Sequence, residues 1–231
     1  MSVVIRAQGL RRSFRVGPVE VHAVDGIDLE IEAGEFAALK GRSGSGKTTL
    51  LNLLGGLDRA TEGDVYLNGR ALAALSDDEM TTLRRRDIGF VFQSFALLPT
   101  FSAYENVELP LRIARIDADE RAARTRRCLD LVGLGNRADH RPDEMSGGQQ
   151  QRVAIARALV GSPSLILADE PTGELDSRSG EQIMELFLRI AREDGVTVVM
   201  ASHDPIVDEY AGVVYEMKDG RIAEVRRRVQ P

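Results

Sequence analysis

The chain has 231 residues, 43% of them hydrophobic and 29% charged, which is the balance of a folded domain with a continuous apolar core. Its net charge of −6 argues against a nucleic-acid-binding protein, and its single cysteine, Cys128, excludes an internal disulfide and fits a reducing compartment. No apolar run reaches the roughly 18 residues that span a bilayer, so we expect any membrane association to come through a partner.

The first forty residues indicate β-strands. Residues 3–10 are one candidate, and residues 27–31 alternate apolar with acidic side chains, which is the period of a half-buried strand. Residues 36–39 form a short apolar run suited to a buried strand. A glycine-rich loop follows directly, and an apolar helix opens at Thr49.

The next segment predicts two short strands with a helix between them. Residues 65–67 end in an Asn-Gly turn signal, and residues 88–92 form an apolar strand running into a glutamine. The helix begins after Ser76, an N-cap followed by acidic residues, and ends near Arg86 in a basic last turn.

Residues 96–145 carry no strong strand signal and predict a mostly helical lobe. Its clearest helix covers residues 117–132. Asp117 and Glu120 have the spacing of a capping box at its start, and we expect Cys128 to be packing filler on one helix face.

The remaining chain alternates helices and strands. Helices are predicted over residues 146–161 and 177–194, buried strands over residues 165–168 and 196–201, and a terminal hairpin over residues 213–225. Such alternation implies a mostly parallel sheet with ligands at the carboxyl ends of its strands.

The loop after the strand at residues 36–39 fits the phosphate-loop (P-loop) pattern G-x-x-x-x-G-K-[ST] in the required strand–loop–helix context. Its glycines let backbone N–H groups wrap a phosphate, and the helix that follows points its positive end at the same anion. Lys47 would contact the β- and γ-phosphates, and the Thr48 hydroxyl would be a Mg²⁺ ligand. The predicted phosphate-binding residues are Gly41, Arg42, Ser43, Gly44, Ser45, Gly46, Lys47, Thr48 and Thr49.

Two carboxylates end the buried strand at residues 165–168. Asp169 would complete the Mg²⁺ site that Thr48 begins, and Glu170 is placed to deprotonate an attacking water. An acidic helix cap is the alternative interpretation of this pair, and the P-loop elsewhere in the chain favours the catalytic one.

A second glycine motif separates this chain from other P-loop classes. Ser146-Gly147-Gly148-Gln149-Gln150-Gln151-Arg152 resembles the signature sequence of the ATP-binding-cassette (ABC) family. Ser146 and Gln149 also have capping-box spacing, so a well-capped helix is the alternative interpretation. Bare glycine backbone at a positive helix end is what close approach of a phosphate requires.

The resemblance covers about residues 3–225 and implies roles for the other motifs. Gln93 resembles the Q-loop, which reaches the metal and the γ-phosphate, and Glu170 the catalytic glutamate. Residues 173–176 resemble the D-loop, which contains Asp176, and His203 resembles the switch histidine. Phe14 matches the aromatic position that stacks on adenine.

The resemblance also implies a fold and partners. The fold would be an α/β P-loop NTPase of the ABC ATPase type: a mixed-sheet core, an N-terminal antiparallel β subdomain and a helical subdomain. We treat residues 1–231 as one ABC ATPase domain, with its core in residues 1–95 and 146–231 and the helical subdomain in residues 96–145. ATP and Mg²⁺ would be held between one copy's P-loop and the signature of a second copy, which includes Ser146, Gly147, Gly148 and Gln149, in a head-to-tail homodimer.

Within the family, short motifs such as residues 51–58 and 97–100 resemble the lipoprotein-release and macrolide-export type. There a stand-alone ATPase drives a separate permease that carries a large extracytoplasmic domain. The chain would then be peripheral at the cytoplasmic face of the inner membrane, with no nucleic acid among its partners. The permease would dock beside residues 93–110, where the candidate contacts are Phe95, Leu97, Leu98 and Phe101, unless these side chains pack in the lobe's own core.

Five positions depart from the usual motifs. Arg42 replaces a proline, Thr48 a serine, Met145 a leucine and Phe14 a tyrosine, and none of these removes a required group. Glu174 replaces the usual D-loop asparagine, adds negative charge near the dimer seam and puts the tightness of closure in question.

Two other functions fit a cassette of this kind. One is a regulatory ATPase of a membrane complex that transports nothing, as in a cell-division assembly of related architecture. The other is a soluble DNA-repair or translation ATPase, which is disfavoured because the chain has neither a coiled-coil insertion nor a second cassette.

Overall fold

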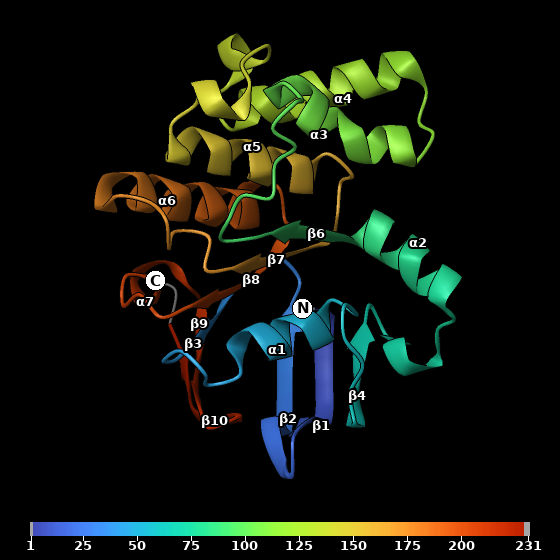
Figure 1. The fold of residues 1–231 in the computed structure, drawn as a ribbon, viewed down its shortest axis with the longest axis vertical. Coiled ribbons are helices and arrows are strands. Elements are labelled where there is room, and N and C mark those ends of the chain that lie inside the picture. The colour runs from blue at the N-terminus through green and yellow to red at the C-terminus, as the bar shows by residue number, and fades with distance from the viewer. Residues whose placement is uncertain (1, 229–231) are drawn as a thin grey trace.

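The computed structural model describes residues 2–228 and contains two sheets with helices around and between them (Figure 1). A four-stranded antiparallel sheet has the order β2-β1-β4-β5, and a six-stranded sheet has the order β10-β9-β3-β8-β7-β6. The predicted fold class, an α/β P-loop cassette with both kinds of sheet and a helical lobe, is confirmed.

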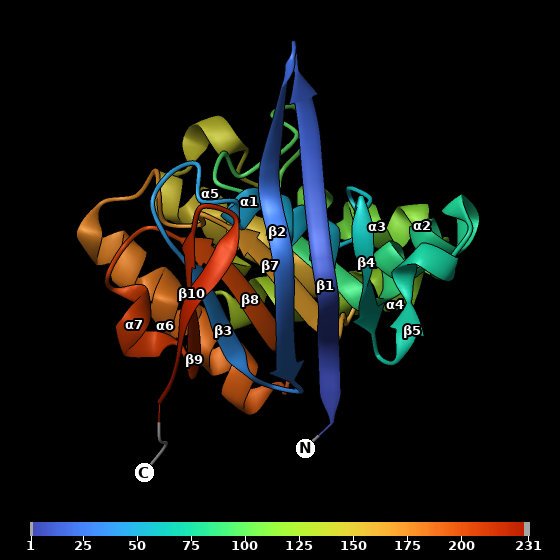
Figure 2. The same ribbon diagram turned by 90° about the horizontal axis from the view of Figure 1, so that it is seen from below.

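The antiparallel sheet is dominated by one long hairpin, whose two strands lie side by side at full length in Figure 2. Its strands are β1 (Val3–Val16), β2 (Val19–Glu32), β4 (Glu62–Leu67) and β5 (Arg70–Ala71), and a short 3₁₀ turn η1 (Leu72–Ala74) follows. β1 extends well beyond the predicted end at residue 10. The extension is an exposed ribbon in which Arg15 pairs with Glu20, so it lacks the apolar alternation that marks a half-buried strand.

The six-stranded sheet is parallel except for its edge hairpin. Its strands are β3 (Phe36–Lys40), β6 (Ile88–Val91), β7 (Leu165–Asp169), β8 (Thr197–Ser202), β9 (Val213–Lys218) and β10 (Arg221–Arg227). The β9–β10 turn has Asp219 and Gly220 at φ 50° and 76°, the positive values that a two-residue hairpin turn requires. Because the five neighbouring strands from β9 to β6 run in the same direction, their carboxyl ends lie along a single edge of the sheet.

Alternate residues of the central strands pack in two separate hydrophobic clusters, one on each side of the sheet. Ala37 and Leu39 of β3 face the cluster that contains α1 (Lys47–Leu54) and the antiparallel sheet. Phe36 and Ala38 face the opposite cluster, which contains α5 (Gly147–Leu159) and α6 (Ser177–Glu193). The parallel sheet is thus covered on both sides, as its uniformly apolar strands require.

Four further helices complete the described part of the fold: α2 (Asp77–Asp87), the short α7 (Val207–Tyr210) and, in the lobe at the top of Figure 1, α3 (Ala103–Ile113) beside α4 (Ala118–Leu131). Two 3₁₀ turns, η2 (Gly135–Arg137) and η3 (Pro142–Glu144), lead from α4 to α5. Cys128 is half-buried and packs against the core, and burial raises the pKa of its thiol to about 11, so its prediction as filler is confirmed. No helix within residues 2–228 is both long enough and apolar enough to cross a membrane.

The predicted capping box of α4 is wrong. The Asp117 carboxylate accepts a hydrogen bond from Asp119 N at 2.9 Å instead of from Glu120 N. The Glu120 carboxylate is held by Arg124, one turn along the helix, at 3.3 Å. The i,i+4 ion pair therefore takes the side chain that a capping box would have used.

Candidate nucleotide-binding site

The P-loop joins the end of β3 to the start of α1. The N-cap of α1 is Gly46 at φ 98°, and no side chain caps the helix. Its first backbone N–H groups are therefore directed at the loop without a side-chain acceptor, which is the arrangement that binds an anion.

The glycines of this loop are required by close contacts. A Cβ on Gly41 would lie 2.4 Å from Met217 O, and one on Gly46 would lie 2.1 Å from Ala23 O. Gly44 has φ 79°, a conformation that side chains disfavour. The loop backbone thus forms a concave cradle that fits a phosphate group.

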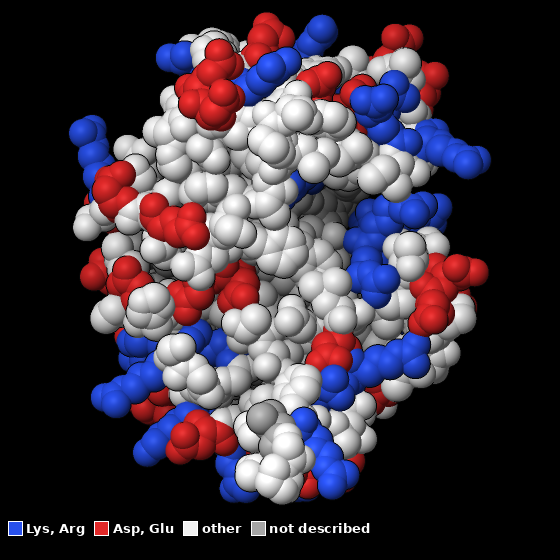
Figure 3. Space-filling view, viewed as in Figure 1, with Lys and Arg blue, Asp and Glu red and all other residues white. Residues whose placement is uncertain are grey.

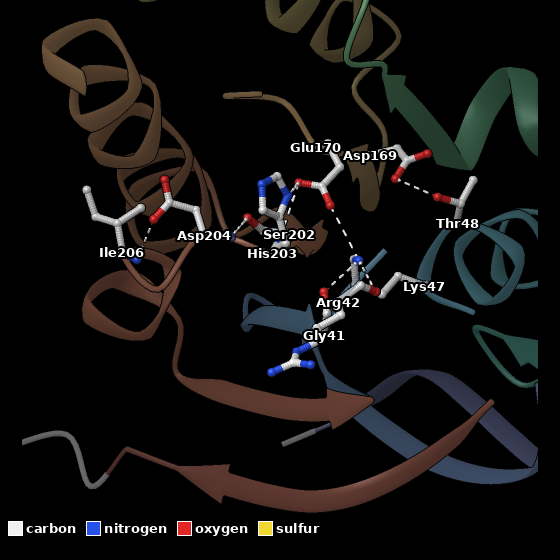
Figure 4. A network of polar contacts seen from close by, with 10 residues as sticks. All are labelled: Gly41, Arg42, Lys47, Thr48, Asp169, Glu170, Ser202, His203, Asp204 and Ile206. Atoms are coloured by element: carbon white, nitrogen blue, oxygen red, sulfur yellow. Dashed lines mark hydrogen bonds and ion pairs between the residues drawn. The ribbon is translucent and has the colours of Figure 1, made fainter. Parts of the chain in front are cut away.

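Lys47 supplies the positive charge of the cradle. Its side chain is only 6% exposed, and its Nζ donates to Gly41 O at 2.8 Å and to Arg42 O at 3.3 Å (Figure 4). Glu170 Oε1 lies 3.5 Å from the same ammonium. The Lys47 ammonium therefore lies between the P-loop and the acidic end of β7.

Glu170 occupies a strained turn directly after β7. Its φ is 47°, in the left-handed region, and its N–H donates to Ala201 O at 2.9 Å. Oε2 lies 2.9 Å from His203 Nδ1 and accepts from His203 N at 3.3 Å (Figure 4). The carboxylate is thus held by His203, directly after β8, and by Lys47, and it lines the pocket.

Asp169 and Thr48 meet where the predicted Mg²⁺ site lies. Thr48 Oγ1 donates to Asp169 Oδ1 at 3.1 Å. Burial raises the pKa of Asp169 and the Glu170 charge raises it further, although the Thr48 hydrogen bond lowers it. A hydroxyl and a carboxylate are hard oxygen ligands that suit Mg²⁺, which uses few protein ligands together with substrate phosphates. No cluster of three or more acidic, His or Cys side chains that could hold a metal alone occurs among residues 2–228.

A pocket of about 890 Å³ gathers most of the predicted residues. Three residues on its wall were not predicted: Ala23, Lys40 and Glu216. Ser45 is not on the wall; it is buried beneath the loop, with its hydroxyl close to Gly41. The predicted residues that line the pocket are Phe14, Gly41, Arg42, Ser43, Gly44, Gly46, Lys47, Thr48, Thr49, Gln93, Glu170 and His203.

Phe14, within β1, and Gln93, shortly after β6, both lie on the pocket wall. The Phe14 ring is 38% exposed, and the Arg12 guanidinium lies 4.5 Å from its centroid in a cation–π contact. Gln93 Nε2 lies 3.1 Å from the position that a Cβ on Gly173 would take, so it borders the D-loop. The adenine and metal contacts of these two residues remain predictions.

The signature residues are not on this pocket's wall. Ser146 Oγ accepts from Gln149 N at 3.4 Å, and Gln149 Oε1 accepts from Ser146 N at 3.0 Å, so the predicted capping box is confirmed. Asp176 of the D-loop caps α6 by accepting from Ser179 N at 2.9 Å. Their contact with a nucleotide stays a prediction that needs a second chain.

A glycine cradle at a helix N-terminus, a buried lysine, and a hydroxyl–carboxylate pair between the start of α1 and the end of β7 define a P-loop nucleotide-binding protein. The ABC transporter family model matches residues 24–173, and this chain belongs to that family.

The similarity to other cassettes extends over nearly the whole chain. An uncharacterised ABC transporter ATP-binding protein of Thermotoga maritima is 48% identical over 229 residues, which cover 99% of this chain and 97% of that protein. The solved dimeric structure of the ATP-binding cassette MJ0796, in a post-hydrolysis state bound to ADP and phosphate, matches with a TM-score of 0.88 at 43% identity, covering 96% of this chain and 98% of that one.

The macrolide export ATP-binding/permease protein MacB of Wolinella succinogenes is 48% identical over 219 residues, covering 95% of this chain. The match covers only 34% of that protein, so the chain spans about a third of the length of this relative.

Proposed function

We propose that the chain binds MgATP in the P-loop pocket and hydrolyses it in a homodimer. The observation that carries this proposal is the position of Glu170. Its carboxylate lies beside the buried Lys47 ammonium and the His203 imidazole, at the edge of a phosphate-sized cradle. A base beside an anion-binding site is the arrangement that hydrolysis of a terminal phosphate requires.

The residues act in distinct ways. The P-loop amides and Lys47 would bind and orient the β- and γ-phosphates. Glu170 would accept a proton from the attacking water, and His203 would hold that carboxylate and reach the γ-phosphate. Mg²⁺, held by Thr48 and Asp169 with Gln93 through water, would neutralise charge on the phosphate oxygens.

A second copy would complete the site with its signature helix. Gly147 and Gly148 begin α5 directly after the Ser146 cap, so these two positions of its first turn contribute no side chain of their own. Asp176 would join the seam beside them. This head-to-tail arrangement rests on the family resemblance and on the dimeric state of the MJ0796 cassette.

We propose a membrane permease as the partner that uses this motion. A groove of about 510 Å³ lies between α2, β6 and the helical lobe, with an apolar floor and Arg84, Arg85 and Arg157 on its wall. Figure 3 shows this hollow, bordered by basic side chains. Residues 96–145 would act as the subdomain that carries the groove's upper wall.

The predicted docking side chains differ in exposure. Leu98 is 40% exposed, Phe95 and Phe101 are half-buried, and Leu97 packs against the core. Leu98 is therefore the most exposed of the four, although none of the four lines the groove itself. A permease of the macrolide-export kind would place the chain at the cytoplasmic face of the inner membrane. In the regulatory alternative, the same groove would receive a membrane protein that transports nothing. Reconstitution with the co-purified partner, followed by a transport assay, would distinguish these two functions.

The direct test is nucleotide binding and phosphate release by the purified chain. We expect magnesium-dependent ATP affinity and phosphate release, both lost in Lys47→Ala. Lys218→Ala is the matched control because Lys218 is exposed and is not on the pocket wall. Absence of magnesium-dependent ATP affinity in the parent chain would overturn the proposal.

A further inference from the structure

The pocket contains one cation that is not engaged by an acid. Lys47 contacts Glu170 and Lys40 pairs with Asp208 at 2.8 Å, whereas Arg42 is exposed and forms no ion pair within residues 2–228. In Figure 4 the Arg42 guanidinium points away from the Lys47 ammonium. Arg42 is thus free to meet a group that comes from outside the chain.

The D-loop offers the complementary charge. The Asp176 carboxylate is committed to α6, because it accepts from Ser179 N at 2.9 Å and from Ser179 Oγ at 2.7 Å. Glu174 is exposed and makes no ion pair within the part of the chain that the structure describes. It is the carboxylate of this loop that remains available.

Glu174 lies beside the signature helix tip. A Cβ on Gly147 would lie 4.0 Å from Glu174 O and 3.3 Å from Leu175 Cδ2. Any surface that receives the start of α5 therefore also receives Glu174. In the proposed dimer that surface is the mouth of the other chain's P-loop pocket, where Arg42 lies.

We infer that Arg42 of one chain forms an ion pair with Glu174 of a second copy across the dimer seam. This inference rests on the proposed head-to-tail dimer and adds to it a contact that does not pass through the nucleotide. Because the dimer is two-fold symmetric, the ion pair occurs twice. Its contribution to the free energy of dimerisation is therefore counted twice. The negative charge of Glu174, which replaces the usual asparagine, would then stabilise the closed dimer instead of weakening it.

Charge reversal in two separate chains tests the pair. Arg42→Glu and Glu174→Arg are each made in the Glu170→Gln background, and ATP-dependent dimerisation is measured by analytical ultracentrifugation. Each variant alone would place like charges at both seams, and we expect its dimer Kd to rise by about tenfold or more. Mixed in equal amounts, the two chains have opposite charges at both seams, and we expect the Kd of the mixed dimer to return to within about threefold of the parent value at low salt.

Controls separate the possible outcomes. Arg192→Glu and Glu193→Arg reverse exposed charges near the far end of α6, roughly 24 Å along the helix from the D-loop, and should leave dimerisation unchanged. Absence of rescue in the mixture, or rescue only when both changes are in one chain, overturns the inference while leaving the dimer intact. Absence of an ATP-dependent dimer in the Glu170→Gln parent contradicts the proposed function itself.

Discussion

Gln151 Nε2 donates a hydrogen bond to Pro171 O at 2.7 Å, in a position where the Gln151 side chain is completely buried. Gln151 belongs to the signature helix, and Pro171 follows Glu170 in its strained turn. The bond thus joins the helix that would contact the partner's nucleotide to the residue directly after Glu170, which would activate water on this chain's own nucleotide.

Gln151→Leu should reduce turnover more than ATP affinity. The substitution leaves the Pro171 carbonyl buried without a donor, which costs about 1–3 kcal/mol of unfolding free energy and frees the Glu170 turn. We expect kcat to fall about tenfold, with ATP affinity within about twofold of the parent. Steady-state ATPase assays and ATP titrations measure the two. Gln150→Leu is the control, because Gln150 bonds only to Met145 O at 3.1 Å and is half-exposed. Unchanged kcat in a destabilised Gln151→Leu protein would make the bond merely structural.

Glu170→Gln should bind ATP but hydrolyse it slowly. The amide keeps the shape of the side chain but cannot accept the proton of the attacking water, so we expect turnover to fall by at least ~10²-fold. ATP affinity should stay within about threefold of the parent, because Lys47 and the P-loop amides are unchanged. Glu181→Gln, at an exposed position on α6, is the matched control. Turnover within about threefold of the parent would remove Glu170 from the role of base.

The sequence predicted those parts of the fold that depend on neighbouring residues. The strand–loop–helix of the P-loop and the Asp219-Gly220 turn are local, and both are present. The helix α3 was missed as an element, although Ser102 and Glu105 form a capping box at its start. Pro110 within that helix weakens the pattern that would have predicted it.

The site was less predictable where it depends on pairing between distant segments. Lys40 and Glu216 reach the pocket because β3 and β9 pair in the register that sets these two residues side by side. The burial of Gln151 depends on where the chain places Pro171, twenty residues along. Neither the Lys40–Glu216 pairing nor the Gln151–Pro171 contact is marked by a sequence pattern, because each is fixed by the packing of the complete sheet.

Ser146→Arg should abolish ATP-dependent dimerisation without affecting ATP binding to the single chain. The arginine would place a bulky cation at the helix tip that is proposed to face the partner's nucleotide, and Ser146 is not on the wall of its own pocket. Loss of the cap also costs about 0.5–2 kcal/mol of unfolding free energy. Ser76→Ala removes the equivalent capping box of α2 and controls for that cost. Ultracentrifugation with ATP, in the Glu170→Gln background, measures the dimer; a dimer as tight as the parent's would refute the role of the signature in trans.

Asp169→Asn should stabilise the protein without nucleotide while weakening the magnesium dependence of its ATP affinity. Burial raises the pKa of Asp169, so the folded protein binds this proton more tightly than the unfolded chain does. The stability contributed by the group is therefore present at acidic pH and is lost as pH rises through the folded pKa.

We accordingly expect a higher Tm for Asp169→Asn at neutral pH, and a difference from the parent that vanishes toward acidic pH. Asp176→Ala should behave in the opposite way, because hydrogen bonds from Ser179 lower the pKa of Asp176, so that its contribution is present at neutral pH and lost on acidification. Thermal unfolding across this pH range measures both. ATP titrations with and without Mg²⁺ should show the magnesium-dependent gain in affinity reduced about tenfold in Asp169→Asn. A lower Tm at neutral pH, or magnesium dependence equal to the parent's, would contradict the assignment of Asp169 as a buried carboxylate held for the metal.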